Sequence, residues 1–298
     1  MWVRVQRWEA GGMRLMGVVL AGLVTLALVN LALVNLAAVD SPVALAGSST
    51  PVQPRIVGGA STRTAEHPWM VALTTATSAS AYCAGALIGA DRVVTAAHCI
   101  TDYRPDGIRV IAGRTDLRSS DGQERQVLRY WIHPDYTSPE HGDDVAVLFL
   151  DRALPYPTLP LETDPGAYWA GAPATVLGWG YTAERGPSSS ELRSADVVLV
   201  ADSDCAATYR QFDQRAMVCA GTARGGSDAC YGDSGGPLVA GGRLIGVTSW
   251  GSGCARAGRP GVYTRVASYA AEIDAQRPEP VELRRDYSDY WDWPGRLG

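Results

Sequence analysis

Residues 225–239, "GGSDACYGDSGGPLV", surround Ser234 with five glycines, with Asp233 directly before it and Asp228 six positions back. A serine becomes a nucleophile in acyl transfer when a base takes its hydroxyl proton and a carboxylate orients that base. The same mixture of Gly, Ser and Asp is also typical of ordinary turns. Whether Ser234 is a nucleophile therefore depends on the base and the carboxylate that the rest of the chain offers.

Histidine is the natural base near neutral pH, and the chain has four histidines. His98 ends the apolar run "VVTAAHC", where a disulfide from the neighbouring Cys99 could fix its backbone. His67 and His133 each precede a proline, which predicts surface turns, and His141 lies in the polar loop "PEHGDD". His98 is therefore the candidate base.

Asp144 is the candidate orienting carboxylate, because it begins "DVAVLFL", where a polar loop enters an apolar strand. A carboxylate buried there needs a partner, and an imidazole N–H would serve. Asp143 is the adjacent alternative, and it is the one expected to stay in water.

The order of these residues along the chain separates the known serine-hydrolase arrangements. "GDSGG" also fits the Gly-x-Ser-x-Gly nucleophile elbow of α/β-hydrolases, but that arrangement needs its acid and histidine after the serine. No histidine follows Ser234, and no aspartate in a strand setting precedes His98 as the subtilisin order requires. The remaining order is His98, Asp144, Ser234, which is that of the chymotrypsin-like enzymes.

The elements around these residues read as strands. Short apolar runs recur between Gly, Pro, Asp and Ser clusters from Ile56 onward, which indicates an antiparallel all-β barrel or sandwich. Only residues 266–276 have clear helical spacing, and Pro278 ends that helix. The charged and aromatic stretch 278–298 is predicted to be a tail outside the core.

The N-terminus reads as a targeting segment. Its basic residues are Arg4, Arg7 and Arg14. They precede an apolar run at 15–39, and Ala44 and Ala46 then fit a cleavage site, so residues 1–46 are predicted to be a signal peptide and 47–55 a pro-segment. The long apolar run leaves an uncleaved membrane anchor as the alternative. A secreted protein is the expectation.

Composition excludes some functions. The net charge of −5 argues against a nucleic-acid partner, which needs a basic face. The six cysteines all follow the predicted signal peptide, and an even number in an exported protein implies disulfides, although six cysteines allow 15 pairings. No Cys-x-x-Cys pair occurs, so zinc or redox chemistry has little support. We expect neither a metal nor another cofactor.

Several motifs together resemble one family. They are "IVGG" at 56–59, "TAAHC" at 95–99, "DVAVLFL" at 144–150, "GWG" at 178–180, "GDSGGPL" at 232–238 and "SWGSGCA" at 249–255. In this order they are similar to the trypsin branch of the chymotrypsin family, over about residues 56 to 275. The resemblance implies two antiparallel six-stranded β-barrels with a C-terminal helix, in a protease domain at 56–277.

The resemblance also implies roles for single residues. Ser234 would be the nucleophile, His98 the proton shuttle and Asp144 the group that fixes the imidazole tautomer. The backbone N–H groups of Gly232 and Ser234 would form the oxyanion hole. An inactive relative that serves as a binding protein is the alternative, and the intact set of three argues against it.

The resemblance further implies a specificity pocket for Arg or Lys. Its substrate-binding residues would be Asp228, Ala229, Ser249, Trp250, Gly251 and Gly261. Asp228 would form the base of the pocket, Gly251 and Gly261 would leave room for a long side chain, and Ser249 would support Asp144. Ala229 stands where trypsin has serine, which favours Arg over Lys. Tyr231 is expected at the mouth of the pocket.

Activation and cross-links follow from the same resemblance. Cleavage between Arg55 and Ile56 would free an ammonium group that pairs with Asp233, so the chain would be made as a zymogen. The implied disulfides are Cys83–Cys99, Cys205–Cys219 and Cys230–Cys254. A monomer acting on proteins or peptides that contain Arg or Lys, and open to protein protease inhibitors, is expected. Arg114 stands where a glutamate calcium ligand would be, so no tight calcium site is predicted.

Overall fold

The computed structural model describes residues 56–277. The predicted signal peptide at 1–46, the predicted pro-segment at 47–55 with Arg55, and the predicted tail at 278–298 lie outside the described residues. Within 56–277, no helix is long and apolar enough to cross a membrane.

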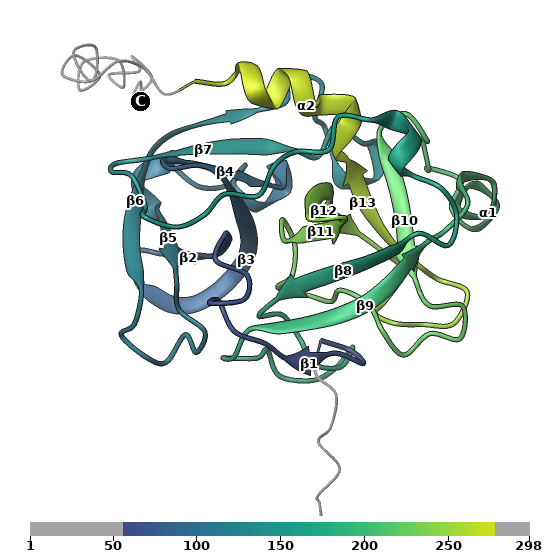
Figure 1. The fold of residues 1–298 in the computed structure, drawn as a ribbon, viewed down its shortest axis with the longest axis horizontal. Coiled ribbons are helices and arrows are strands. Elements are labelled where there is room, and N and C mark those ends of the chain that lie inside the picture. Colours follow the sequence, from purple (N-terminus) through teal and green to yellow (C-terminus); the bar gives the residue numbers. More distant parts are fainter. Residues whose placement is uncertain (1–55, 278–298) are drawn as a thin grey trace, which may run out of the picture. The chain divides into compact units, whose positions relative to one another are not determined.

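The first half of the described chain closes into a barrel of antiparallel strands (Figure 1). Its strands are β2 (Met70–Thr75), β3 (Ser78–Gly89), β4 (Arg92–Thr95), β5 (Ile108–Ala112), β6 (Gln123–Ile132) and β7 (Ala146–Leu150). They pair in the order β2-β3-β4-β7-β6-β5, and β5 pairs with β2 to close the ring. The apolar runs of β2, β4 and β7 are buried along their whole length, or nearly so, because their side chains face either the barrel interior or the rest of the molecule.

The second half forms a second barrel. Its strands are β8 (Pro173–Gly178), β9 (Arg193–Leu199), β10 (Met217–Gly221), β11 (Pro237–Ala240), β12 (Arg243–Trp250) and β13 (Gly261–Arg265). They pair in the order β9-β10-β13-β12-β11-β8, and the pairing of β8 with β9 closes the ring. The short strand β1 (Ala60–Ser61) adds to the outer side of β9. The predicted class, all-β with two six-stranded antiparallel barrels, is confirmed.

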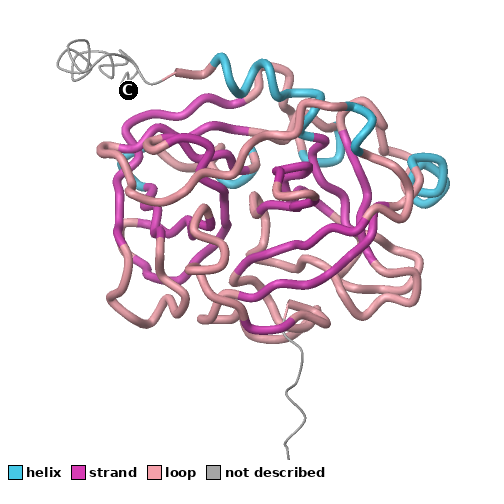
Figure 2. The backbone as a smooth tube through the Cα atoms, in the orientation of Figure 1, coloured by secondary structure: helices cyan, strands magenta, loops and turns pink. Residues whose placement is uncertain are grey.

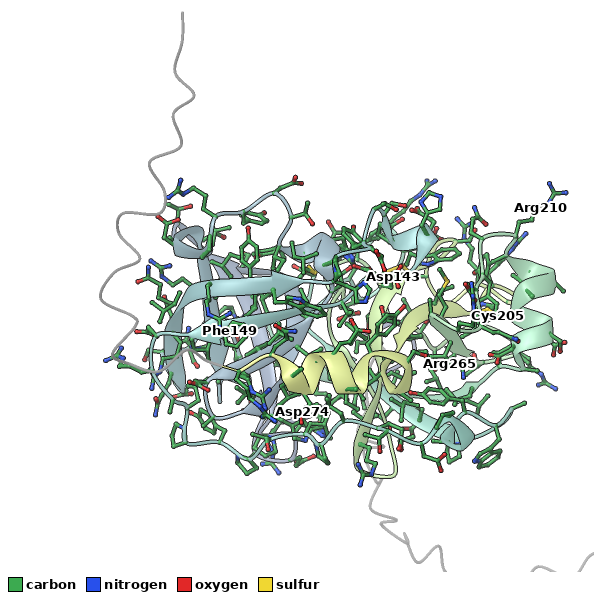
Figure 3. All side chains as sticks on the ribbon, turned by 90° about the horizontal axis from the view of Figure 1, so that it is seen from above. Asp143, Phe149, Cys205, Arg210, Arg265 and Asp274 are labelled. Atoms are coloured by element: carbon green, nitrogen blue, oxygen red, sulfur yellow. A yellow bond between two sulfur atoms is a disulfide. The ribbon has the colours of Figure 1, made fainter. Side chains whose placement is uncertain are left out.

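Helices are few, and strands and loops make up most of the described chain (Figure 2). The short 3₁₀ helices are η1 (Ala97–Cys99), η2 (Pro105–Gly107), η3 (Pro139–His141) and η4 (Pro165–Ala167). The predicted helix at 266–276 is present as α2 (Val266–Ala275). Figure 3 looks onto α2, with Arg265 at its start and Asp274 near its end.

Strand β6 and helix α1 (Asp202–Thr208) are two elements that the apolar pattern did not indicate. Strand β6 carries many polar residues, because one side of it faces solvent at the outside of the barrel, so its sequence lacks the short apolar run of the other strands. Helix α1 is too short to show a helical repeat. Its acidic first turn, with Asp202 and Asp204, suits a helix N-terminus and is the one signal that could have indicated it.

The six cysteines pair as the resemblance implies. Cys83–Cys99 joins β3 to η1, Cys205–Cys219 joins α1 to β10, and Cys230–Cys254 joins the segment before Ser234 to the loop after β12. Each disulfide closes a short loop and restricts the unfolded chain. Two of the three therefore brace segments that carry candidate site residues.

Candidate active site

His98 lies in the middle of η1 and is held by the carboxylate of Asp144. The His98 Nδ1–Asp144 Oδ2 distance is 2.8 Å, and the His98 backbone N–H donates to Asp144 Oδ1 at 3.0 Å. One carboxylate therefore fixes both the ring and the backbone of the histidine. The Nδ1 contact makes Nδ1 the protonated nitrogen of the neutral ring and leaves Nε2 free to accept a proton.

Asp144 is 1% exposed and receives further support from the second barrel. Ser249 Oγ at the end of β12 donates to Asp144 Oδ2 at 2.5 Å, and Thr264 Oγ1 in β13 donates to the Asp144 carbonyl at 2.7 Å. A buried carboxylate is tolerated when it has hydrogen-bond donors of this kind. Thr264 was not predicted, because nothing in "GVYTRV" connects it to a residue 120 positions earlier.

Asp143 does not bind His98. Its carboxylate accepts a hydrogen bond from Tyr269 Oη in α2 at 2.7 Å, and its backbone has a φ of +58°. Of the two neighbouring aspartates, the structure therefore brings Asp144 to the imidazole.

The interpretation of His133 as a surface-turn residue is wrong. Its side chain is buried between Trp131 and Tyr269, and His133 Nε2 lies 3.1 Å from Glu272 Oε2. The proline that follows it does end the strand, but α2 packs over the site and removes it from water. His141 is exposed in η3, as its polar loop sequence predicts.

Ser234 stands on a turn that depends on glycine. Gly232 has a φ of +90° and Gly235 a φ of +75°, in the left-handed region that glycine adopts without steric cost. A Cβ at Gly235 would also lie 2.1 Å from Thr95 Oγ1. The Ser234 carbonyl accepts a hydrogen bond from the Ala84 N–H at 2.8 Å, which ties the turn to β3 of the first barrel.

The backbone N–H groups around Ser234 divide into two kinds. Those of Asp233, Gly235 and Gly236 donate to Cys230, Thr248 and Asp233 carbonyls within the protein. In the described part of the chain, the N–H groups of Gly232 and Ser234 have no such acceptor. Two unused donors therefore lie within one turn, next to the serine.

A pocket of about 240 Å³ opens beside Ser234 and His98, which both line it. All six predicted substrate-binding residues also line it: Asp228, Ala229, Ser249, Trp250, Gly251 and Gly261. Tyr231, expected at its mouth, is 58% exposed and lines it as well. Tyr181, which sequence reasoning missed, packs edge-on against the Tyr231 ring with centroids 5.9 Å apart.

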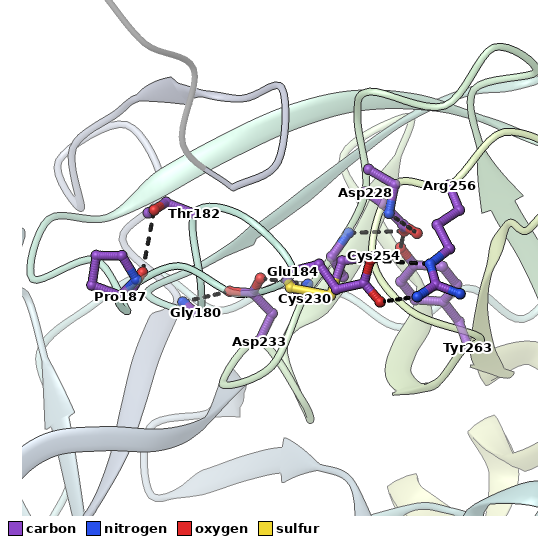
Figure 4. Close-up of a disulfide and its surroundings, with 12 residues drawn as sticks. Gly180, Thr182, Glu184, Pro187, Asp228, Cys230, Asp233, Cys254, Arg256 and Tyr263 are labelled. Atoms are coloured by element: carbon purple, nitrogen blue, oxygen red, sulfur yellow. Dashed lines mark hydrogen bonds and ion pairs between the residues drawn. A yellow bond between two sulfur atoms is a disulfide. The ribbon is translucent and has the colours of Figure 1, made fainter.

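Asp228 is the buried acid of this pocket and is 2% exposed. It accepts hydrogen bonds from the backbone N–H groups of Ala229 at 2.8 Å and Ala255 at 3.3 Å (Figure 4). Burial raises the pKa of Asp228 to about 7. Within residues 56–277 no cationic side chain pairs with it, and a Cβ at Gly261 would lie 2.6 Å from its Oδ1.

Asp233 is a second buried acid, and it points away from the pocket. Its carboxylate accepts from the N–H groups of Gly180 at 2.8 Å and Cys230 at 2.9 Å (Figure 4). Burial raises the pKa of Asp233 to about 7. Ile56 is completely buried in the core of the second barrel. The carbonyl of the following residue, Val57, accepts a hydrogen bond from the Asp228 N–H at 3.2 Å.

Two places in the described chain bring together groups that could bind a metal ion, and neither suits one. The cluster of Cys83, His98 and Cys99 offers no thiolate, because both cysteines are in a disulfide. In the loop that contains Arg114 and Asp121, Arg114 Nε donates to the Asp121 carbonyl at 2.6 Å. A guanidinium there repels a cation and uses one carbonyl that could have been a ligand.

A buried carboxylate, an imidazole and a serine at a cleft between two β-barrels define a serine protease of the two-barrel class. The family model for Trypsin matches residues 56–273. A protein named Trypsin from Saccharopolyspora erythraea is 44% identical over 217 residues, which cover 72% of this chain and 94% of the relative. The chain belongs to the trypsin family of serine proteases.

More distant relatives agree. Trypsin eta from Drosophila melanogaster is 37% identical over 236 residues, covering 76% of this chain and 90% of that protein. Trypsin zeta from Drosophila erecta is 38% identical over 242 residues, covering 75% and 85%.

Proposed function

We propose that this trypsin-family protease is a secreted endopeptidase that cleaves peptide bonds after Arg, and after Lys more slowly. The observation that carries the proposal is Asp228, a buried carboxylate in the pocket beside Ser234 with no cation of its own in the described chain. Such a carboxylate is costly until a cation pairs with it. A substrate Arg or Lys side chain would supply that cation.

Catalysis would use His98, Asp144 and Ser234. Ser234 Oγ attacks the scissile carbonyl carbon while His98 Nε2 takes the hydroxyl proton, and Asp144 stabilises the imidazolium through Nδ1–H. The proton passes to the leaving amine, and the peptide amine departs. Water then attacks the acyl-enzyme with His98 again as base, which returns Ser234 to its starting state.

The oxyanion of the tetrahedral intermediate would be bound by the N–H groups of Gly232 and Ser234. Within residues 56–277 these two N–H groups have no acceptor, which supports this role, because preorganised donors need not be released from another partner before the reaction. A side chain at Gly232 would meet Gly180 Cα at 3.1 Å, and φ there is +90°. Glycine is therefore the residue that keeps this N–H in position.

The preference for Arg over Lys would come from Ala229. A serine hydroxyl at that position could help bind an ammonium, whereas a guanidinium can pair with Asp228 through two parallel hydrogen bonds. Peptides matched except for Arg or Lys at the cleavage position test this preference. Equal kcat/KM for the two would refute it.

Activation would follow cleavage between Arg55 and Ile56. The new Ile56 ammonium would pair with Asp233, whose burial without a cation in the described chain is otherwise costly. The chain would then be a zymogen, and Arg55 would make self-activation feasible. If a Ser234→Ala precursor is processed normally with no other protease present, self-activation is excluded.

The protein would be exported and would act alone. Residues 1–46 would be a cleaved signal peptide and 47–55 the pro-segment of a domain at 56–277, with 278–298 as a tail. The enzyme would act as a monomer on proteins and peptides, would be open to protein protease inhibitors, and would use no cofactor. A net charge of −5 gives no basis for a nucleic-acid partner.

The decisive experiment uses the secreted protein with its N-terminus sequenced. It is assayed on peptides with Arg, Lys, Phe or Ala at the cleavage position, beside a Ser234→Ala control. We expect a chain that starts at Ile56 and cleaves after Arg, with activity absent in the control. No cleavage by a chain that correctly starts at Ile56 would contradict the proposal.

A further inference from the structure

Arg193, the first residue of β9, is a buried arginine whose guanidinium contacts the start of the described chain. It is 3% exposed. Two of its hydrogen bonds go to that segment: Nη1 donates to Ser61 Oγ at 2.9 Å, and Nη2 donates to the Gly59 carbonyl at 3.2 Å. Neither the resemblance nor the composition pointed to this residue.

The six residues 56–61, here called the N-terminal segment, are held by a series of contacts. Ile56 is in the core, and the Val57 carbonyl accepts from the Asp228 N–H. A Cβ at Gly59 would lie 2.3 Å from the Ser194 carbonyl oxygen, so the two backbones meet closely. The segment then ends as β1, where Ser61 faces Arg193 in register.

The chemistry of arginine suits this position. Its planar guanidinium presents several N–H groups in fixed directions, so it can reach a carbonyl and a hydroxyl at once. Hydrogen bonds from a charged donor are stronger than neutral ones. If the N-terminal segment moved away, Arg193 would lose these two acceptors while it remained buried, and a buried donor that loses an acceptor is costly.

We infer that Arg193 is a positioning residue that keeps the N-terminal segment in the register in which the Ile56 amino group can pair with Asp233. The inference rests on the proposed activation at Arg55–Ile56. Arg193 touches neither the substrate nor the reacting atoms. It acts on catalysis through Ile56 and Asp233, by disfavouring the state in which the segment has left its site.

This role has a signature in the pH dependence. The inserted Ile56 amine must be protonated to pair with Asp233, so pairing raises its pKa above the ordinary value of about 8. Activity is then complete at lower pH and is lost as the pH rises through the raised value. A change that weakens the pairing of Ile56 with Asp233 lowers the raised pKa of the Ile56 amine, so activity is lost at a lower pH.

Few other groups near the segment titrate in that range. The ionisable side chains around it are Asp228, Asp233 and Tyr263 in the second barrel, Glu191 beside Ser61, and Glu66 and His67, which bond Thr62. Burial raises the pKa of Asp228 and of Asp233 only to about 7, hydrogen bonds from Arg63 and Thr62 lower the pKa of Glu66, and burial lowers the pKa of His67. Burial raises the pKa of Tyr263 well above its usual value.

The test compares Arg193→Met with the wild type, both as mature chains that begin at Ile56. We expect the pH of half-maximal kcat/KM on the alkaline side to fall by about one pH unit, the effect of a roughly tenfold weaker inserted state. Arg193→Lys should recover part of the shift. Ser61→Ala removes one acceptor and keeps the arginine, so it should shift the alkaline limb by a smaller amount. This variant replaces Arg193→Met in the test if Arg193→Met does not fold.

A second measurement does not depend on activity. The sequence contains no lysine, so the Ile56 α-amino group is the one primary amine of the mature chain. Its rate of carbamylation by cyanate, followed by mass spectrometry at constant pH, reports how often it leaves its site. We expect this rate to rise about tenfold in Arg193→Met, in step with the shift in the pH profile.

Arg92→Met is the matched control. Arg92 is also a buried arginine, 8% exposed, and its Nη1 donates to a backbone carbonyl, that of Gln276, at 2.7 Å. It should lower the melting temperature and leave both the alkaline limb and the carbamylation rate unchanged. If Arg193→Met behaves in the same way, the inference is overturned. If the wild type itself shows no alkaline loss and no protection of Ile56, the proposed activation fails instead.

Discussion

Ser249 and Asp144 come from different barrels and meet in a 2.5 Å hydrogen bond, from Ser249 Oγ to Asp144 Oδ2. The same Asp144 oxygen lies 2.8 Å from His98 Nδ1. The orientation of the imidazole is therefore set by contacts from both halves of the molecule. If the packing between the barrels were loosened, the orientation of the His98 ring would change even if each barrel kept its own structure.

Asp144→Asn should abolish most activity without unfolding the protein. The amide keeps the shape of the carboxylate but stabilises the wrong imidazole tautomer, and the corresponding change in serine-protease triads lowers kcat about 10⁴-fold. Steady-state kinetics on an Arg peptide measure the loss. Asp143→Asn is the control, because Asp143 bonds Tyr269 and not His98, and it should retain most activity. Comparable losses in both variants would contradict the assignment.

Asp228→Asn should stabilise the protein at high pH. The folded-state pKa of Asp228, about 7, lies above that of an unfolded aspartate. Its burial is therefore tolerated below about pH 4, where the proton is bound in both states, and becomes destabilising as the pH rises toward 7. On the inactive Ser234→Ala background, the substitution should raise the melting temperature at pH 8 and change it little at pH 4.

The expected rise for Asp228→Asn is about 2–4 °C for each kcal/mol recovered, as for domains of this size. Asp102→Asn, at an exposed aspartate, is the control and should have no such dependence on pH. An equal effect of Asp228→Asn at both pH values would show that this carboxyl is not buried in its charged form.

Gly180→Ala should reduce activity through Asp233. A Cβ at this position would lie 2.6 Å from Asp233 Cγ and 2.7 Å from its backbone N, too close for either to remain in place. Overpacking of this kind costs about 1–3 kcal/mol. Gly107→Ala, where a Cβ would meet nothing within 4 Å, is the control. Calorimetry and kcat/KM should both distinguish the two variants, and unchanged values for Gly180→Ala would refute the contact.

Calcium should not stabilise the fold. The Arg114 guanidinium occupies the loop that includes Asp121, and the nearby Glu124 carboxylate lies 3.8 Å from Arg109 Nε. A ligand that binds only the native state stabilises it by an amount that grows with the logarithm of the ligand concentration divided by Kd, and so raises the melting temperature. Thermal unfolding with millimolar calcium and with a chelator should therefore coincide. A large rise with calcium would mean that Arg114 does not exclude the ion.

The sequence by itself indicated an antiparallel all-β barrel or sandwich from its short apolar runs between turn residues, and the resemblance of its motifs implied the two six-stranded barrels. Residue type and chain order made His98, Asp144 and Ser234 the candidates. The sequence did not reveal β6, whose outward polar residues hide the strand, or α1, which is too short for a helical repeat. In both elements the local sequence lacks the periodic pattern of apolar residues by which a strand or a helix is predicted.

Only the tertiary structure decided which side chains meet. It buried His133 under α2, and it brought Thr264 to Asp144 and Arg193 to Gly59. These pairs are separated by tens to more than a hundred residues along the chain, and no periodicity connects them. Contacts of this kind arise from barrel closure and from packing of one barrel on the other, so they follow from the fold as a whole.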